Sequence, residues 1–292
     1  MTESLIRVRD LTRVYRRPRT SLTTAGHSVA ALKDVSLDIH AGERFGIVGE
    51  SGSGKSTLIR LLAGLDQPTS GSILFDGQEI AGKPERQLGF LRKRLQFVFQ
   101  DPMGSLDPRM RVRHIVAEPL IAQGHRNPAR RVDELLEAVG LSPSAADRFP
   151  HQFSGGQRQR ISIARALAPE PTVLVADEPV SALDVSVRAQ ILNLLLDLAD
   201  QFSLTLIFVS HDLAVVRRIC ENVGVLHHGE LVEHGPTGEL YDNPRHAYTR
   251  RLVAAVPTIT KALSGVDAEE LARGVASAGA DPTDDAEERA DL

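Results

Sequence analysis

One short stretch of this chain carries the residue types needed to hold a phosphate group. It fits the pattern G-x-x-x-x-G-K-[ST] and consists of Gly49, Glu50, Ser51, Gly52, Ser53, Gly54, Lys55 and Ser56, followed by Thr57. The glycines let the backbone wrap closely around phosphate oxygens, while N–H groups of the loop and of the following helix point at the anion. Lys55 supplies a positive charge for the outer phosphates, and the Ser56 hydroxyl is placed to bind Mg²⁺. We therefore expect this phosphate-binding loop to hold a nucleoside triphosphate.

The flanking sequence supplies the context that this motif requires. Arg44–Val48 before the loop has the pattern of a short apolar strand, and Leu58–Leu62 after it is typical of a helix. Glycine and serine clusters are also common in plain turns. The Lys55-Ser56 pair between a strand and a helix favours the phosphate site over that simpler interpretation.

A pair of carboxylates follows a second apolar strand. Asp177 and Glu178 come directly after Val173–Ala176, a continuous apolar run of the kind found in a parallel strand buried on both faces. Open parallel sheets place their ligand sites at the carboxyl ends of the strands. An aspartate there can hold Mg²⁺, and a neighbouring glutamate can orient or deprotonate an attacking water.

Two further polar side chains are predicted to reach the same edge. His211 follows the apolar strand Leu204–Val209, and Gln100 follows Leu95–Phe99. A lone histidine is more often a surface or core residue than a catalytic one, and we apply that interpretation to His227 and His228. The topology instead favours a γ-phosphate contact for His211, and Gln100 is expected to complete the metal shell or position water.

A second anion-binding helix start is predicted at Ser154, Gly155, Gly156 and Gln157. Ser154 and Gln157 form a capping box for the helix Ile161–Leu167. Capping alone does not select two glycines, each of which costs about 1 kcal/mol in a helix relative to alanine. Glycines do allow a phosphate to approach bare N–H groups at the positive helix terminus. Because one loop already holds a triphosphate, this second element is expected to complete a site on another subunit.

The elements that position these residues predict an α/β domain with a helical insert. Strands are expected at Leu5–Tyr15 and Ala30–Ile39, and the Asp76-Gly77 turn predicts a hairpin. Between residues 101 and 168 the pattern is helical, with helices expected at His114–Gln123 and Ala129–Val139 and a stop at Gly140. A helix at Val187–Asp200 and a late hairpin around Val223–Val232 complete the domain. The segment Arg16–Ser28 is predicted to be an exposed loop, and the acidic tail is predicted to be disordered.

Composition narrows the class of protein. The chain has 292 residues, 42% hydrophobic and 25% charged, as in ordinary globular proteins, and its net charge of −4 gives no sign of nucleic-acid binding. Its one cysteine, Cys220, excludes an internal disulfide and is expected to fill core space at a helix end. No segment reaches the ~18 consecutive apolar residues of a membrane span, and the start lacks the apolar region of a signal peptide. We therefore expect a protein made and kept in the cytosol.

At Ser154–Gln157 the sequence resembles the signature of ABC-type ATPases, and that family's other motifs stand in the expected order. They are Gln100 (Q-loop), Val173–Glu178 (Walker B and catalytic glutamate), Ser181–Asp184 (D-loop), His211 (switch histidine) and Tyr15, which resembles the aromatic that stacks on adenine. The resemblance spans residues 5–260 and implies a P-loop NTPase (RecA-like) core with an antiparallel β subdomain and a helical subdomain at about 101–168. Residues 261–292 are the predicted tail.

The resemblance implies a nucleotide-binding subunit that works in head-to-tail pairs. Each ATP would lie between Lys55 of one chain and Ser154–Gln157 of the other. Mg²⁺ would be held by Ser56, Gln100 and Asp177, while Glu178 and His211 support attack of water on the γ-phosphate. The residues after Gln100 and the helical insert would press on membrane partners, so that closure of the pair changes access across the membrane.

A narrower resemblance is to the ATPases of peptide/nickel importers. It rests on Gln100–Arg109, Pro150–Phe153, Asp177–Ser186 and Asn243–Thr249. That group usually has His-Pro-Tyr-Thr where this chain has Ala247 in place of proline. Some members also carry a cysteine-bound iron–sulfur cluster, which Cys220 alone cannot build.

The sequence thus predicts the ATP-hydrolysing subunit of an importer of oligopeptides or dipeptides, at the cytoplasmic face of the cell membrane. Its expected partners are two transmembrane permease subunits, a second ABC ATPase that is identical or homologous, and indirectly an extracytoplasmic substrate-binding protein. Alternatives are the same role for nickel or another small solute, and an ABC ATPase of translation or DNA repair. A P-loop kinase would leave Ser154–Gln157 unexplained.

Overall fold

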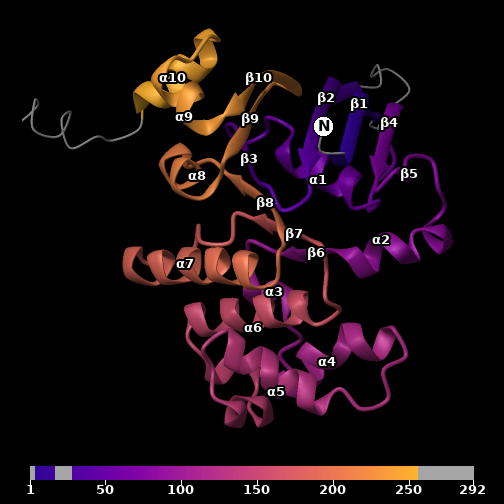
Figure 1. Ribbon diagram of the computed structural model, residues 1–292, viewed down its shortest axis with the longest axis vertical. Helices are drawn as coiled ribbons and strands as arrows, with labels where there is room; N and C mark the ends of the chain where they lie inside the picture. Colours follow the sequence, from indigo (N-terminus) through magenta and orange to yellow (C-terminus); the bar gives the residue numbers. More distant parts are fainter. Residues whose placement is uncertain (1–3, 17–27, 256–292) are drawn as a thin grey trace, which may run out of the picture. The chain divides into compact units, whose positions relative to one another are not determined.

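The computed structural model describes residues 4–16 and 28–255 (Figure 1). The predicted tail and residues 17–27 of the predicted exposed loop lie outside the described residues. The described part contains two sheets and a group of helices inserted between strands, so the expected α/β fold with an antiparallel β subdomain and a helical subdomain is confirmed. The predicted domain boundaries themselves stay predictions.

The larger sheet carries the strand ends that the sequence pointed to. Its order is β10-β9-β3-β8-β7-β6, and all neighbours are parallel except β10 with β9. Its elements are β3 (Arg44–Val48), β6 (Leu95–Val98), β7 (Val173–Asp177), β8 (Thr205–Ser210), β9 (Asn222–His227) and β10 (Glu230–Pro236). Because β3, β6, β7 and β8 are parallel, their carboxyl ends meet at one edge of the sheet.

The smaller sheet is antiparallel in the order β2-β1-β4-β5. It consists of β1 (Ser4–Arg16), β2 (Ser28–His40), β4 (Ser70–Phe75) and β5 (Gln78–Glu79). The Asp76-Gly77 turn, with φ of 50° and 71°, joins β4 to β5 as predicted, and Phe75 pairs with Gln78.

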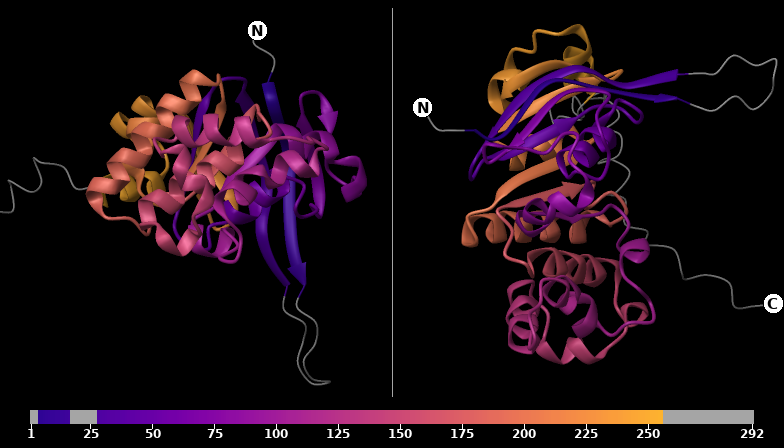
Figure 2. Two further views of the ribbon diagram at one scale, coloured as in Figure 1. Left: turned by 90° about the horizontal axis from the view of Figure 1, so that it is seen from below. Right: turned by 90° about the vertical axis from the view of Figure 1, so that its right-hand side faces the viewer.

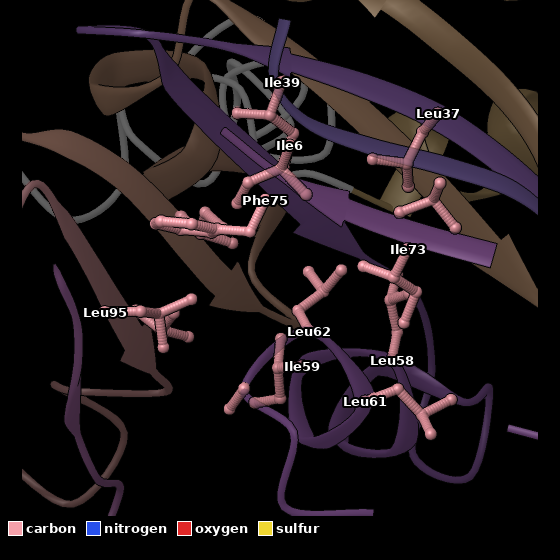
Figure 3. Packing of buried hydrophobic residues seen from close by; sticks show 14 of the residues in the cluster. Ile6, Leu37, Ile39, Leu58, Ile59, Leu61, Leu62, Ile73, Phe75 and Leu95 are labelled. Carbon is pink, nitrogen blue, oxygen red and sulfur yellow. The ribbon is translucent and has the colours of Figure 1, made fainter. Parts of the chain in front are cut away.

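A hydrophobic core attaches this sheet to α1 (Lys55–Leu62) (Figure 3). Ile6, Ile39 and Phe75 from the sheet are buried with Leu58 and Leu62 of α1. Burying one such side chain stabilises a fold by about 1.5–3 kcal/mol. Since α1 begins at the lysine of the phosphate-binding loop, this core also fixes where that lysine lies.

The inserted helices lie on the opposite side of the parallel sheet from the antiparallel sheet (Figures 1 and 2). They are α3 (Pro102–Ser105), α4 (Val112–Ala122), α5 (Ala129–Ala138) and α6 (Gly155–Leu167), with short 3₁₀ turns at Pro143–Asp147 and Pro150–Gln152. In α5 the predicted apolar face is buried, and Gly140 ends the helix with φ of 72°.

The remaining helices cover the parallel sheet or follow it. They are a 3₁₀ turn at Glu85–Gln87, α2 (Gly89–Arg94), α7 (Val185–Gln201), α8 (Leu213–Ile219), α9 (Thr237–Asp242) and α10 (Ala247–Ala255). Cys220 is buried directly after α8, as predicted. Among residues 4–16 and 28–255, no helix combines the length and the apolar character needed to cross a bilayer.

Candidate active site

The phosphate-binding loop is packed so closely that two of its positions accept only glycine. Gly49 has φ of 155°, and a Cβ there would lie 2.2 Å from the carbonyl oxygen of Leu226. Gly54 has φ of 111°, and its Cβ would lie 2.6 Å from the carbonyl oxygen of Ala31. Side chains rarely adopt such φ values, and neither contact leaves room for one. The glycines therefore let the loop lie directly against the neighbouring backbone.

Lys55 lies inside this loop and is only 6% exposed. Its Nζ donates to the carbonyl oxygens of Gly49, at 2.6 Å, and Glu50, at 2.9 Å. Burial lowers the pKa of Lys55, and the charges of Glu178 and Asp177 oppose that shift. The ammonium group is thus held in the loop, with the two carboxylates of the β7 end close enough to act on it.

The end of β7 is shaped by an unusual backbone conformation at Glu178, where φ is 45°. The Glu178 amide donates to Val209 O at 3.0 Å, and its carbonyl oxygen accepts from the Ser181 hydroxyl at 3.1 Å. A non-glycine residue at positive φ persists only where its surroundings hold it, and such residues cluster at functional sites. These contacts fix the direction in which the Glu178 side chain leaves the strand.

Three side chains from three neighbouring strands meet at this edge. Glu178 Oε1 lies 3.2 Å from His211 Nδ1, and Glu178 Oε2 accepts from Gln100 Nε2 at 3.3 Å. Asp177 lies beside them, and its pKa is raised by burial and by the charge of Glu178, with Lys55 opposing. The structure therefore brings together the carboxylate, amide and imidazole that the sequence placed at the ends of separate strands.

A cavity of about 1150 Å³ contains the carboxylate, amide and imidazole, whereas Asp177 is not among its lining residues. Its lining includes the loop from Gly49 to Thr57 except Ser53, together with Gln100, Glu178 and His211. Ser53 is instead buried, with its carbonyl oxygen accepting from the amide of Gly229. This volume is ample for a nucleotide, since small-molecule sites are about 300–1,000 Å³.

Tyr15 is not among the residues that line the cavity. Its hydroxyl donates to Asp66 at 2.6 Å, and the Arg13 guanidinium lies over its ring, 4.5 Å from the centroid. Val29, which faces Tyr15 across the β1–β2 pair, does line the cavity. The stacking of Tyr15 on adenine stays a prediction.

The start of α6 also lies outside the cavity lining of its own chain. The capping box is present in full: the Gln157 amide donates to Ser154 Oγ, and the Ser154 amide donates to Gln157 Oε1 at 3.0 Å. A Cβ on Gly156 would lie 2.4 Å from Val187 Cγ1 of α7. The second glycine therefore has a packing reason that the sequence did not reveal, while Gly155 would meet Leu183 at an ordinary 3.4 Å.

Several cavity residues carry no local motif and were missed by sequence reasoning. They are Val29, Ala30, Ala31 and Lys33 of β2, His228 in the β9–β10 turn, and Leu252 of α10. His228 had been assigned to surface or core. Near Leu252, the sequence offers only the similarity of Asn243–Thr249 to importer ATPases. That similarity does not predict where the segment lies relative to the nucleotide cavity.

Comparison with protein families gives two matches. Residues 32–181 match the family described as ABC transporter, and residues 232–281 match the oligopeptide/dipeptide transporter, C-terminal region.

Individual proteins agree with these matches. The chain is 47% identical over 263 residues to the oligopeptide transport ATP-binding protein OppF of Bacillus subtilis, covering 88% of this chain and 84% of that protein. It is 48% identical over 261 residues to the di/tripeptide transport ATP-binding protein DppF of Pseudomonas aeruginosa, covering 88% of this chain and 80% of that protein.

Among solved structures the chain resembles the ATP-binding cassette MJ0796, a dimer in a post-hydrolysis state with ADP and Pi. The TM-score is 0.70 at 33% identity, covering 80% of this chain and 98% of that one. The chain therefore belongs to the ABC transporter family and to the oligopeptide/dipeptide transporters within it.

Proposed function

We propose that this chain is the ATP-binding and ATP-hydrolysing subunit of an ABC importer that takes up oligopeptides or dipeptides. The observation that carries the proposal is the single cavity that joins the phosphate-binding loop to Gln100, Glu178 and His211. The relatives named for oligopeptide and di/tripeptide transport support the cargo, and they do not favour nickel or a role in translation or DNA repair.

Hydrolysis follows from the positions of the cavity side chains. The loop amides and Lys55 bind the phosphates, and Glu178 at the carboxyl end of β7 accepts a proton from the attacking water. Gln100 and His211 already contact the Glu178 carboxylate, at 3.3 and 3.2 Å. They are placed to orient the carboxylate and the water and to contact the γ-phosphate.

Ser56, Gln100 and Asp177 are proposed to hold Mg²⁺ together with the phosphates. All three offer oxygen, the ligand that this ion prefers. Ser56 and Gln100 line the cavity, and the raised pKa of Asp177 reflects a buried carboxylate next to another one, where a cation is electrostatically favoured. When bound, the ion neutralises charge on the phosphate oxygens.

A second ABC ATPase, identical or homologous, is proposed to supply Ser154–Gln157 to this site. In one chain these residues lie outside the cavity lining, which agrees with a role at the nucleotide of another chain. The dimeric state of the related MJ0796 cassette supports this pairing.

Two transmembrane permease subunits are proposed to dock on the helical subdomain. A second cavity of about 660 Å³ there is lined by Arg109, Met110, Arg111, His114, Glu118, Ile121, Ala122 and Phe149. Ile121, one of the residues that line it, is 56% exposed. A cavity lined by both apolar and charged side chains suits the end of a helix from a partner. This contact would hold the chain at the cytoplasmic face of the membrane, with the extracytoplasmic binding protein acting through the permeases.

Peptide uptake in the native cell tests the proposal. Deleting the gene should abolish accumulation of labelled di- and oligopeptides, and the wild-type gene should restore it while a Glu178→Gln gene should not. Normal peptide uptake in the deletion strain, with loss of nickel uptake instead, would contradict the peptide cargo.

A further inference from the structure

Helix α10 is hydrogen-bonded to the phosphate-binding loop, although the two partners are 198 positions apart in the sequence. The Glu50 amide donates to the Tyr248 hydroxyl at 2.9 Å. Tyr248 is only 2% exposed, and Leu252, one helical turn further on, lines the nucleotide cavity. Residues four apart lie on the same face of a helix, so one face of α10 contacts both the loop and the cavity.

Glu50, whose amide donates to Tyr248, is also one of the two residues that bind the Lys55 ammonium. The carbonyl oxygen of Glu50 accepts from Lys55 Nζ at 2.9 Å, while its amide is held by Tyr248. Both backbone polar groups of Glu50 are therefore engaged, which restricts the φ and ψ angles of this residue. Fixing Glu50 in turn fixes one of the two acceptors of the Lys55 ammonium.

Tyr248 is itself held by strand β9. Its ring stacks on His227, with centroids 3.9 Å apart and planes inclined by 27°. The Tyr248 amide donates to His246 Nδ1 at 3.2 Å. Stacking of this kind stabilises an aromatic pair beyond the burial of its rings. The stack on His227 and this hydrogen bond therefore hold the phenol in position.

Strand β10 anchors the start of α10 through Glu233. Its carboxylate accepts from the amides of Arg245, at 2.8 Å, and His246, at 3.0 Å. Burial acts to raise the pKa of Glu233, but the polar groups around the carboxylate, including these two amides, outweigh it and lower the pKa. The carboxylate is thus charged and directed at the helix start, where a negative charge is favourable.

We propose that Tyr248 is a positioning residue for ATP binding: it holds Glu50, and with it Lys55, in the arrangement that receives the phosphates. Glu233 and His227 act through Tyr248 by fixing the helix and the ring. The positioning role thus gives a function to the segment Asn243–Thr249, which contains Tyr248. It rests on the nucleotide site proposed above. Leu252, on the same helix, lines the nucleotide cavity.

Tyr248→Phe tests the hydrogen bond while keeping the ring and its stack on His227. One net hydrogen bond corresponds to about a three- to tenfold change in affinity. We therefore expect Tyr248→Phe to raise the KM and the Kd for ATP by about that factor while kcat is retained. The matched control is Tyr241→Phe, because Tyr241 is also buried and its hydroxyl has no hydrogen-bond partner in the part of the chain that the structure describes. The control should leave the KM, the Kd and kcat unchanged.

An unchanged KM in Tyr248→Phe, with or without a lower Tm, would overturn the proposal, because it would leave the tyrosine a purely structural role. If that variant does not fold, Glu233→Ala, which frees the start of α10 without altering the loop, carries the same expectation and the same contrary result. Lys55→Ala distinguishes a failure of the proposed nucleotide site from a failure of the positioning role of Tyr248. If Lys55→Ala binds ATP like wild type, the nucleotide site itself is wrong. If it loses ATP while Tyr248→Phe binds normally, only the positioning role fails.

Discussion

Glu178 Oε1 lies 3.2 Å from Nδ1 of His211, the residue that follows the neighbouring strand β8. The positive φ of Glu178 and the hydrogen bond from its amide to Val209 set this relationship, because they turn the side chain at the point where β7 ends. The same carboxylate also meets Gln100. Glu178 is thus the group that connects three strand ends, and we propose that it acts as the base.

Replacing Glu178 with glutamine tests that role. Glutamine has nearly the same shape and can still meet Gln100 and His211, but it cannot accept a proton. We expect ATP hydrolysis to fall by about 10²–10⁴-fold, the usual contribution of a positioned general base, while the Kd for ATP stays the same. Steady-state turnover and calorimetric ATP binding are the measurements, with Glu134→Gln on the exposed face of α5 as the control. Undiminished turnover would remove Glu178 from the mechanism.

Ser154→Arg tests whether the helix start serves a second chain. Because Ser154 does not line the cavity of its own chain, ATP binding to the isolated protein should be unchanged. Hydrolysis in the assembled complex should be lost, because the arginine would obstruct the joined site. Lys55→Ala, by comparison, should lose both. Normal hydrolysis by the assembled Ser154→Arg complex would contradict the shared site.

The close contact between Gly156 and Val187 predicts a paired effect on stability. A Cβ at Gly156 would lie 2.4 Å from Val187 Cγ1, so Gly156→Ala should destabilise the fold by about 1–3 kcal/mol through overpacking. The double variant Gly156→Ala, Val187→Ala should recover most of this loss in thermal unfolding. Independent, additive effects of the two substitutions would show that this contact does not decide the stability. If the double variant is stable yet cannot hydrolyse ATP in the complex, Gly156 is also needed at the nucleotide phosphates.

Asp66 predicts a pH-dependent contribution to stability. Burial acts to raise its pKa, but hydrogen bonds from the Tyr15 hydroxyl and the Gln67 amide, together with the charge of Arg13, outweigh it and lower the pKa. A lowered folded-state pKa means that the stabilisation is present above the unfolded-state pKa of about 3.9 and is lost as the pH falls through the lower folded-state value.

Asp66→Asn should therefore be less stable than wild type at pH 7, by about 1–3 kcal/mol. The difference in Tm between the two proteins should shrink below about pH 4. Thermal unfolding at several pH values checks this, and a difference that stays constant down to pH 3 would be contrary to it. Asp10→Asn, in which an exposed hydrogen bond from Ser36 is altered, is the control.

The parts of the fold and site that lie in short contiguous motifs were predictable from the sequence. The phosphate-binding loop needs glycines at Gly49 and Gly54 because the backbone passes so close to Leu226 and Ala31. The glycines themselves are visible in the sequence, so the loop could be predicted from it. Likewise, the apolar run of β7 followed by two carboxylates predicts a buried strand with a polar end. Parallel pairing of β7 with β6 and β8 then brings Gln100 and His211 to that end.

What the sequence left open are contacts between residues that are far apart and carry no periodic signal. Tyr248 and Glu50 are 198 positions apart, and nothing in either neighbourhood predicts their hydrogen bond. The hydroxyl of Tyr15 binds Asp66, 51 positions away, a choice that depends on how β1 packs over the end of α1. The spatial neighbour of Gly156, Val187, also becomes visible only once α6 packs on α7.

The most direct test of the central claim is to identify what this protein binds in its own cell. The tagged chain would be purified from membranes solubilised in mild detergent, and the co-purifying proteins identified by mass spectrometry. We expect two proteins with several membrane spans, with or without a second ABC ATPase, whose presence would also distinguish a heterodimer from a homodimer. Recovery of ribosomal or DNA-repair proteins in their place would contradict it.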